Sequence, residues 1–213
     1  VQKYIHQMLL ALDYLHFLGT CHGNLKSSNV LITKEGKVKL IDFGLKAFYV
    51  NLKKKEAFLD AWMPYAPPEV AKGGLDSAFS IKADVWSVGC VALRLLKGGS
   101  LWDKKDSASI KKALAKGQGP PLPECSAPME SFLRKCLTVE CEERPLPTDL
   151  LKLRLFSGST IIDNTRGAEI PTVNSPARSQ RSEPCTPEQV AAGDAADGKA
   201  DNIAPALPVG AGA

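Results

Sequence analysis

Residues 22–32 read HGNLKSSNVLI, and residues 38–45 read VKLIDFGL. The short apolar runs at 30–32 and 38–41 are typical of β-strands, and Glu35-Gly36-Lys37 between them favours a tight turn. The stretch therefore predicts a small β-hairpin that follows a polar loop, residues 22–29.

Apolar residues on either side of this hairpin recur at helical spacing. Residues 1–18 predict an amphipathic helix that ends at Gly19. Residues 84–96 are apolar on almost every side, which predicts a buried central helix with Asp84 as its N-cap. Further helices are predicted at the ranges 107–116, 128–137 and 147–155, whereas 45–66 reads as irregular.

Composition predicts one globular domain: of 213 residues, 44% are hydrophobic and 23% are charged. The sequence holds no apolar run of about 18 residues, so it predicts no membrane-spanning helix. The first residues do not resemble a signal peptide, and the chain starts without Met inside a predicted helix, as a fragment would. The six cysteines form no C-x-x-C pair, which disfavours a structural zinc site and predicts reduced thiols in a cytoplasmic protein.

The composition changes after Phe156. Residues 157–213 are rich in Ala, Gly, Pro and Ser, which predicts a disordered tail behind a folded domain at 1–156. The domain carries 23 basic and 16 acidic residues, but its lysine runs lack interleaved aromatic residues. We therefore expect a solvated basic surface and no nucleic-acid partner.

Five motifs in order resemble a eukaryotic protein kinase domain. They are HGNLKSSNVLI at 22–32, IDFGL at 41–45, PPEV at 67–70, DVWSVGC at 84–90 and EERP at 142–145. The later motifs are most similar to Ser/Thr kinases of the mitogen-activated protein kinase kinase kinase type, and HGNLKSSNVL also resembles plant receptor-like kinases. The resemblance implies a protein-kinase-like (α+β) fold, here the mostly helical C-terminal lobe without the N-terminal lobe.

The resemblance also implies a site for Mg²⁺ and ATP. Asp42, in the Asp42-Phe43-Gly44 motif, matches the family's magnesium ligand, and Asn29 matches the ligand of a second magnesium ion. Lys26 matches the lysine that touches the γ-phosphate.

Four further residues match the family's framework. Glu69 and Arg144 correspond to a buried ion pair, and Asp84 to a residue that hydrogen-bonds the backbone near His22. His22 itself is expected to be a packed, hydrogen-bonded residue and not an acid or base.

Four positions depart from the family pattern, and the smallest departure is Pro67, which stands where the family has Ala. Asn24 stands at the position of the catalytic base, and Gly23 replaces an arginine that binds a phosphorylated activation loop. Trp62 falls where Ser/Thr kinases carry Thr, and we expect it either to pack or to fill the substrate groove. Between Leu45 and Ala66 the sequence holds no Ser or Thr.

The motifs that hold ATP in the family's N-terminal lobe do not precede Val1, so this chain alone is not expected to bind the nucleotide. Three functional readings stay open. The chain is an inactive, pseudokinase-like fragment, the rear half of a longer active Ser/Thr kinase, or a binding module that presents residues 107–155 to a partner kinase. Each reading implies protein substrates or partners, and none implies a membrane.

Overall fold

The computed structural model describes residues 1–44, 60–73, 77, 79–103 and 105–157. Apart from Ser157, the predicted tail lies outside these described residues, as does most of the predicted irregular stretch at 45–66. The described part is mostly helical with one two-stranded sheet, as the predicted fold class requires.

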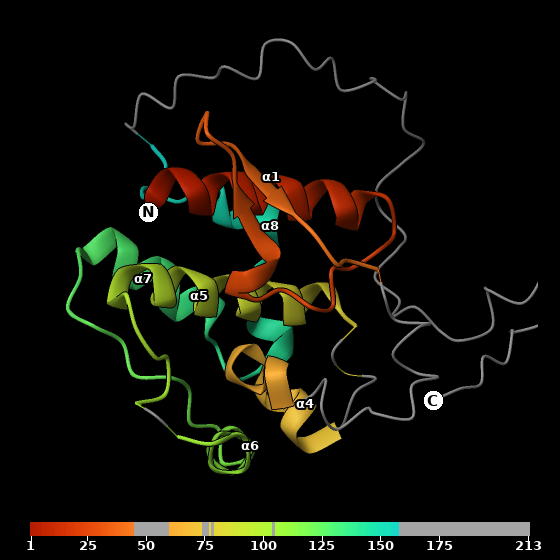
Figure 1. Ribbon diagram of the computed structural model, residues 1–213, viewed down its shortest axis with the longest axis vertical. Helices are drawn as coiled ribbons and strands as arrows, with labels where there is room; N and C mark the ends of the chain where they lie inside the picture. Colours follow the sequence, from red (N-terminus) through yellow and green to blue (C-terminus); the bar gives the residue numbers. More distant parts are fainter. Residues whose placement is uncertain (45–59, 74–76, 78, 104, 158–213) are drawn as a thin grey trace, which may run out of the picture. The chain divides into compact units, whose positions relative to one another are not determined.

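The N-terminal helix and the hairpin form as predicted. Helix α1 spans Gln2–Phe17 and buries one apolar face, made of Ile5, Met8, Leu9, Leu12 and Leu15. Strands β1 (Val30–Ile32) and β2 (Val38–Leu40) pair antiparallel, and Val30 lies opposite Leu40. Figure 1 shows the hairpin crossing in front of α1. Gln7 of α1 joins the two, because its Oε1 accepts a hydrogen bond from the Val38 amide at 2.8 Å.

The central helix begins earlier than predicted. Helix α5 spans Ile81–Lys97, and its N-cap is Ser80, whose hydroxyl accepts a hydrogen bond from the Ala83 amide at 3.0 Å. The prediction of Asp84 as N-cap is wrong, because Asp84 lies inside the first turn and its carboxylate binds another part of the chain. The helix ends at Gly98, whose φ of 65° suits a left-handed C-terminal cap.

Shorter elements surround α5. They are the 3₁₀ turns η1 (Ser27–Asn29), η2 (Met63–Tyr65) and η4 (Cys141–Glu143), and the helices α4 (Pro68–Gly73), α6 (Ser107–Ala115), α7 (Ala127–Cys136) and α8 (Pro147–Leu150). Helix α4 was not predicted. The last helix is shorter than predicted, because Lys152 and Leu153 donate to carbonyls three residues back instead of four.

Helix α5 forms the centre of the hydrophobic core. Every residue from Ala83 to Leu93 is buried. At Gly89 the helix approaches α7 so closely that an added Cβ would lie 2.7 Å from Cβ of Cys136. Among the described residues, no helix is long and apolar enough to cross a membrane.

Candidate functional site

A single carboxylate holds the loop that precedes the hairpin. Asp84 accepts hydrogen bonds from the amides of His22 at 2.7 Å and Gly23 at 2.9 Å. Its Oδ2 also lies 2.8 Å from Nε2 of His16 on α1. The first turn of α5 therefore fixes both α1 and the start of residues 22–29, which we call the candidate catalytic loop.

His22 is fully buried within this loop. Its Nδ1 accepts a hydrogen bond from the Asn24 amide at 3.3 Å, which assigns the proton of the neutral ring to Nε2. The ring packs edge-on against Phe43, with the ring centroids 6.2 Å apart. Burial lowers the pKa of His22, and the nearby charge of Asp84 only partly opposes this shift. A neutral, packed His22 matches the expectation of a packed residue.

The two asparagines of the loop are tied to each other. Nδ2 of Asn29 donates to the Asn24 carbonyl at 2.8 Å, and both residues are buried, with exposures of 3% and 2%. The Ile41 amide donates to the Asn29 carbonyl at 3.1 Å, which extends the hairpin pairing by one residue. This bond brings Asp42, the next residue, to the same end of the hairpin as Asn29.

Asp42 has an unusual backbone conformation. Its φ is 57°, in the left-handed region that few residues other than glycine adopt, and its side chain is exposed. Gly44 is also left-handed, with φ of 67°, and its amide donates to the His22 carbonyl at 3.3 Å. Strained backbone of this kind concentrates at functional sites. Lys26, the other candidate nucleotide contact, is half-buried on the same loop.

Trp62 packs beneath the candidate catalytic loop. The side chain is only 1% exposed, and its Nε1 donates to the Leu25 carbonyl at 3.2 Å. Of the two expectations for Trp62, packing is therefore confirmed.

The framework ion pair forms with two parallel hydrogen bonds. Nη1 and Nη2 of Arg144 each lie 2.6 Å from a carboxylate oxygen of Glu69. Arg144 is 1% exposed, and its other hydrogen bonds go to the carbonyls of Lys82, Thr138 and Val139. All five N–H donors of the guanidinium thus have a partner, and its carbon lies over the Trp86 ring, 5.1 Å from the ring centroid.

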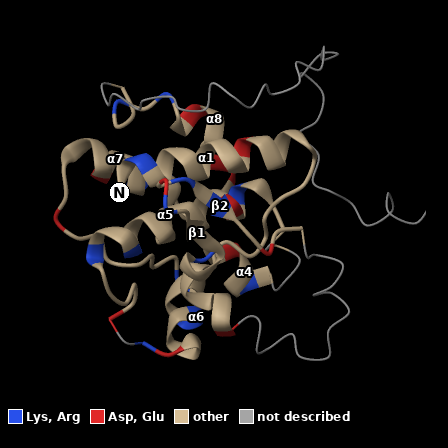
Figure 2. Ribbon diagram, turned by 45° about the horizontal axis from the view of Figure 1, so that its top comes forward, with Lys and Arg blue, Asp and Glu red and all other residues tan. Residues whose placement is uncertain are grey.

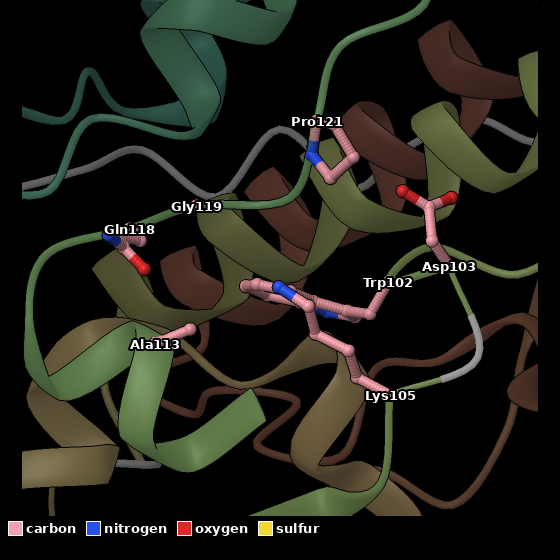
Figure 3. A pocket seen from close by; sticks show the side chains of 7 residues that line it. All are labelled: Trp102, Asp103, Lys105, Ala113, Gln118, Gly119 and Pro121. Atoms are coloured by element: carbon pink, nitrogen blue, oxygen red, sulfur yellow. The ribbon is translucent and has the colours of Figure 1, made fainter. Parts of the chain in front are cut away.

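A cavity of about 320 Å³ lies apart from these residues, between the connections that flank α6. Figure 3 shows Lys105 lying across the ring of Trp102 within it, and the Lys105 Nζ is 6.0 Å from the ring centroid. Asp103, on the rim, forms an exposed ion pair with Lys97. The cavity contains no residue of the candidate catalytic loop.

Sequence reasoning missed several contacts of the site. The contact of His16 with Asp84 was not predicted. Phe79 closes the space next to Gly23, and Tyr65 bonds Ser27 at 2.7 Å. No local pattern marks these residues, because their partners lie 38 or more positions away along the chain.

The chain is similar to known kinases along most of its length. Residues 1–156 match the family model of the protein kinase domain. The chain is 32% identical over 163 residues to the mitogen-activated protein kinase kinase kinase MCK1 of Pyricularia oryzae, an alignment that covers 73% of this chain and 11% of that protein. It is 34% identical over 166 residues to the mitogen-activated protein kinase kinase kinase 2 of Arabidopsis thaliana, covering 74% of this chain and 25% of the relative.

A third relative, the MAP kinase kinase kinase mkh1 of Schizosaccharomyces pombe, is 36% identical over 157 residues, covering 68% of this chain and 14% of the relative. The chain thus spans a quarter or less of the length of these curated relatives. The family-model match spans residues 1–156, the range in which all five motifs lie. The chain therefore belongs to the protein kinase family, close to the mitogen-activated protein kinase kinase kinases.

Proposed function

We propose that this chain is a signalling module of the protein kinase family in which phosphoryl transfer is impaired, and that it acts through protein partners. The observation that carries the proposal is Asn24 at the position of the catalytic base. The surrounding loop keeps its anchorage to Asp84 and its internal bond from Asn29, so the change affects the chemistry of the loop more than its shape.

An amide at this position can orient a hydroxyl but cannot accept its proton. A positioned general base contributes about 10²–10⁴ in rate, which corresponds to about 3–5 kcal/mol of activation free energy. Asn24 is also only 2% exposed. A substrate hydroxyl has to come within hydrogen-bond reach of the base, and burial of this side chain opposes that approach.

The described residues fit a magnesium ion chemically. Asn29 and Asp42 offer an amide oxygen and a carboxylate oxygen at one end of the hairpin, and oxygen is the ligand that magnesium prefers. When bound with ATP, magnesium would neutralise charge on the phosphates. Lys26 would contact a phosphate. Two protein ligands leave most of the six positions of magnesium to water and phosphate oxygens, so we expect weak binding by this chain.

The second candidate function is that of an active Ser/Thr kinase of which this chain is the rear part. The specific observation in its favour is that Lys26, Asn29 and Asp42 keep the identities of the family's nucleotide and metal contacts. In that case residual transfer would survive without the base, since loss of a base slows the reaction but does not abolish it.

The family implies protein partners, and we propose the helices of residues 107–155, which are α6, α7 and α8, as a contact with a partner kinase. Figure 2 shows basic and acidic residues interspersed over the described elements, as on an ordinary solvated surface.

The five described cysteines are free thiols. Free thiols support a reducing compartment, and the cytoplasmic location stays a prediction.

The test is phosphotransfer by the purified 213-residue chain, with millimolar Mg-ATP and a generic basic protein as substrate. We expect no transfer and no magnesium-dependent rise in melting temperature. The kinase domain of the Arabidopsis relative serves as positive control. Transfer that the Asp42→Ala variant abolishes would overturn the proposal and favour the second candidate.

A further inference from the structure

Residues 62–66 lie at the end of the stretch that matches the family's activation loop. Side chains hold this segment against the candidate catalytic loop. Trp62 supplies the first contact: its indole is buried beneath the loop, and Nε1 donates to the Leu25 carbonyl at 3.2 Å. In the family pattern this position carries Thr, whose side chain is too small to fill the same space. The tryptophan therefore adds both packing and a hydrogen bond.

Tyr65 supplies the second contact. Its hydroxyl lies 2.7 Å from Oγ of Ser27, which is in the same loop as Leu25. The backbone of the segment is held as well, because the Tyr65 carbonyl accepts from Oγ of Ser87 at 3.0 Å. The Pro64 carbonyl accepts from Nε1 of Trp102 at 3.0 Å. The segment is thus fixed to the loop on one side and to α5 and its following connection on the other.

This chain has no space for the arginine side chain that, in the family, binds the phosphorylated activation loop. Gly23 stands where the family carries an arginine that binds the phosphorylated loop. Its φ is 68°, and an added Cβ would lie 2.5 Å from Cδ1 of Phe79. A side chain at this position would need both a strained backbone and displacement of a buried ring. No Ser or Thr occurs between Leu45 and Ala66 to carry a phosphate.

We propose that Trp62, Tyr65 and Ser27 form a clasp that keeps the segment 62–66 docked on the candidate catalytic loop independently of phosphorylation. The clasp takes over the task that a phosphate and an arginine perform in a regulated kinase. The chain then presents one fixed arrangement of loop and segment to its partners. The inference rests on the proposed function only in treating residues 22–29 as the family's catalytic loop.

The clasp can be tested by hydrogen–deuterium exchange of the whole chain, measured for the amides of residues 22–29 where exchange reports the opening equilibrium. Trp62→Phe keeps an aromatic ring but removes the indole N–H, so the loop amides should exchange about fivefold faster, the effect of one lost hydrogen bond. Tyr65→Phe and Ser27→Ala should each give a similar increase. The double variant Tyr65→Phe with Ser27→Ala should exchange no faster than either single variant, because both changes remove the same hydrogen bond.

Tyr14→Phe is the matched control, since Tyr14 is 52% exposed on α1, and it should leave loop exchange unchanged. Exchange of α7, which reports global opening, should rise no more than exchange of the loop, because the lost hydrogen bond destabilises the folded state relative to every open state that lacks it. Unchanged loop exchange in both Trp62→Phe and Tyr65→Phe would overturn the clasp. So would an additive effect of Tyr65→Phe and Ser27→Ala. Phosphotransfer by the wild-type chain would contradict the proposed function but not the exchange result.

Discussion

The contacts of Arg144 and the candidate catalytic loop are each organised by one buried charge, Arg144 in the first case and Asp84 in the second. They differ in the charges that surround it. Arg144 keeps a carboxylate partner, Glu69, and its hydrogen bonds go to three carbonyls besides. The loop keeps Asp84 as its anchor, but the side chains at positions 23 and 24 carry no charge. The charges that hold the fold are present, and so are Lys26 and Asp42, whereas positions 23 and 24 hold neutral residues. Under the proposed function, the neutral residues at positions 23 and 24 would impair phosphoryl transfer while the framework contacts keep the fold.

The largest effect should come from breaking the framework pair. Arg144→Met removes a buried cation and leaves Glu69 without its partner, so the free energy of unfolding should fall by about 3–5 kcal/mol. Urea denaturation measures it. The matched control is Arg134→Met, because Arg134 forms an exposed pair with Glu130 one turn away, at 2.6 Å. This control should cost about 0.5 kcal/mol or less. Equal losses in the two variants would contradict the framework role of Arg144.

A smaller effect should come from the crowded glycine of the loop. Gly19 and Gly23 are both left-handed, but an added Cβ meets nothing within 4 Å at Gly19 and meets Phe79 at Gly23. Both Gly→Ala variants strain the backbone, and only Gly23→Ala also overpacks the core. Gly23→Ala should therefore destabilise by about 1–3 kcal/mol more than Gly19→Ala.

Thermal unfolding of the two glycine variants tests this comparison. In a Phe79→Ala background, Gly23→Ala should destabilise no more than Gly19→Ala does, because the space that the added Cβ needs is then free. If Gly19→Ala lowers the stability more than Gly23→Ala does, Phe79 does not crowd the position of Gly23.

The smallest effect should be on pH dependence. Burial lowers the pKa of His22 in the folded state relative to 6.5, while Asp84, Asp42 and His16 act as nearby charges. Below about pH 6.5 the unfolded chain binds a proton that the folded chain binds less readily, so stability should fall as the pH falls. In His22→Phe the loss of stability between pH 7 and pH 5 should be smaller than in the wild type. Tyr14→Phe should keep the wild-type dependence of stability on pH. A larger loss of stability in His22→Phe than in the wild type would contradict a lowered pKa of His22 in the folded state.

The sequence predicts the local elements well and the long-range contacts poorly. Helix α1, the hairpin and the α5 core follow from periodicity, and the Glu69–Arg144 pairing follows from the family resemblance. The N-cap of α5 was misplaced, since Ser80 and Asp84 are both good capping residues and only the contact of Asp84 with His22 decides between them. The burial of Trp62 was left open for the same reason, because Leu25 lies 37 positions away.

The most direct test of the central claim is a rescue series in a fusion protein that places the N-terminal lobe of the Arabidopsis relative before Val1. Asn24→Asp restores the base, and Trp62→Thr restores the residue that the family pattern carries at position 62. Steady-state phosphorylation of a basic peptide is measured for each single variant and for the double variant, after their melting temperatures show that all are folded. We predict no gain from Asn24→Asp alone and a gain of about 10²-fold from the double variant. A gain of that size from Asn24→Asp alone would contradict the account, because the missing carboxylate would then be the only defect.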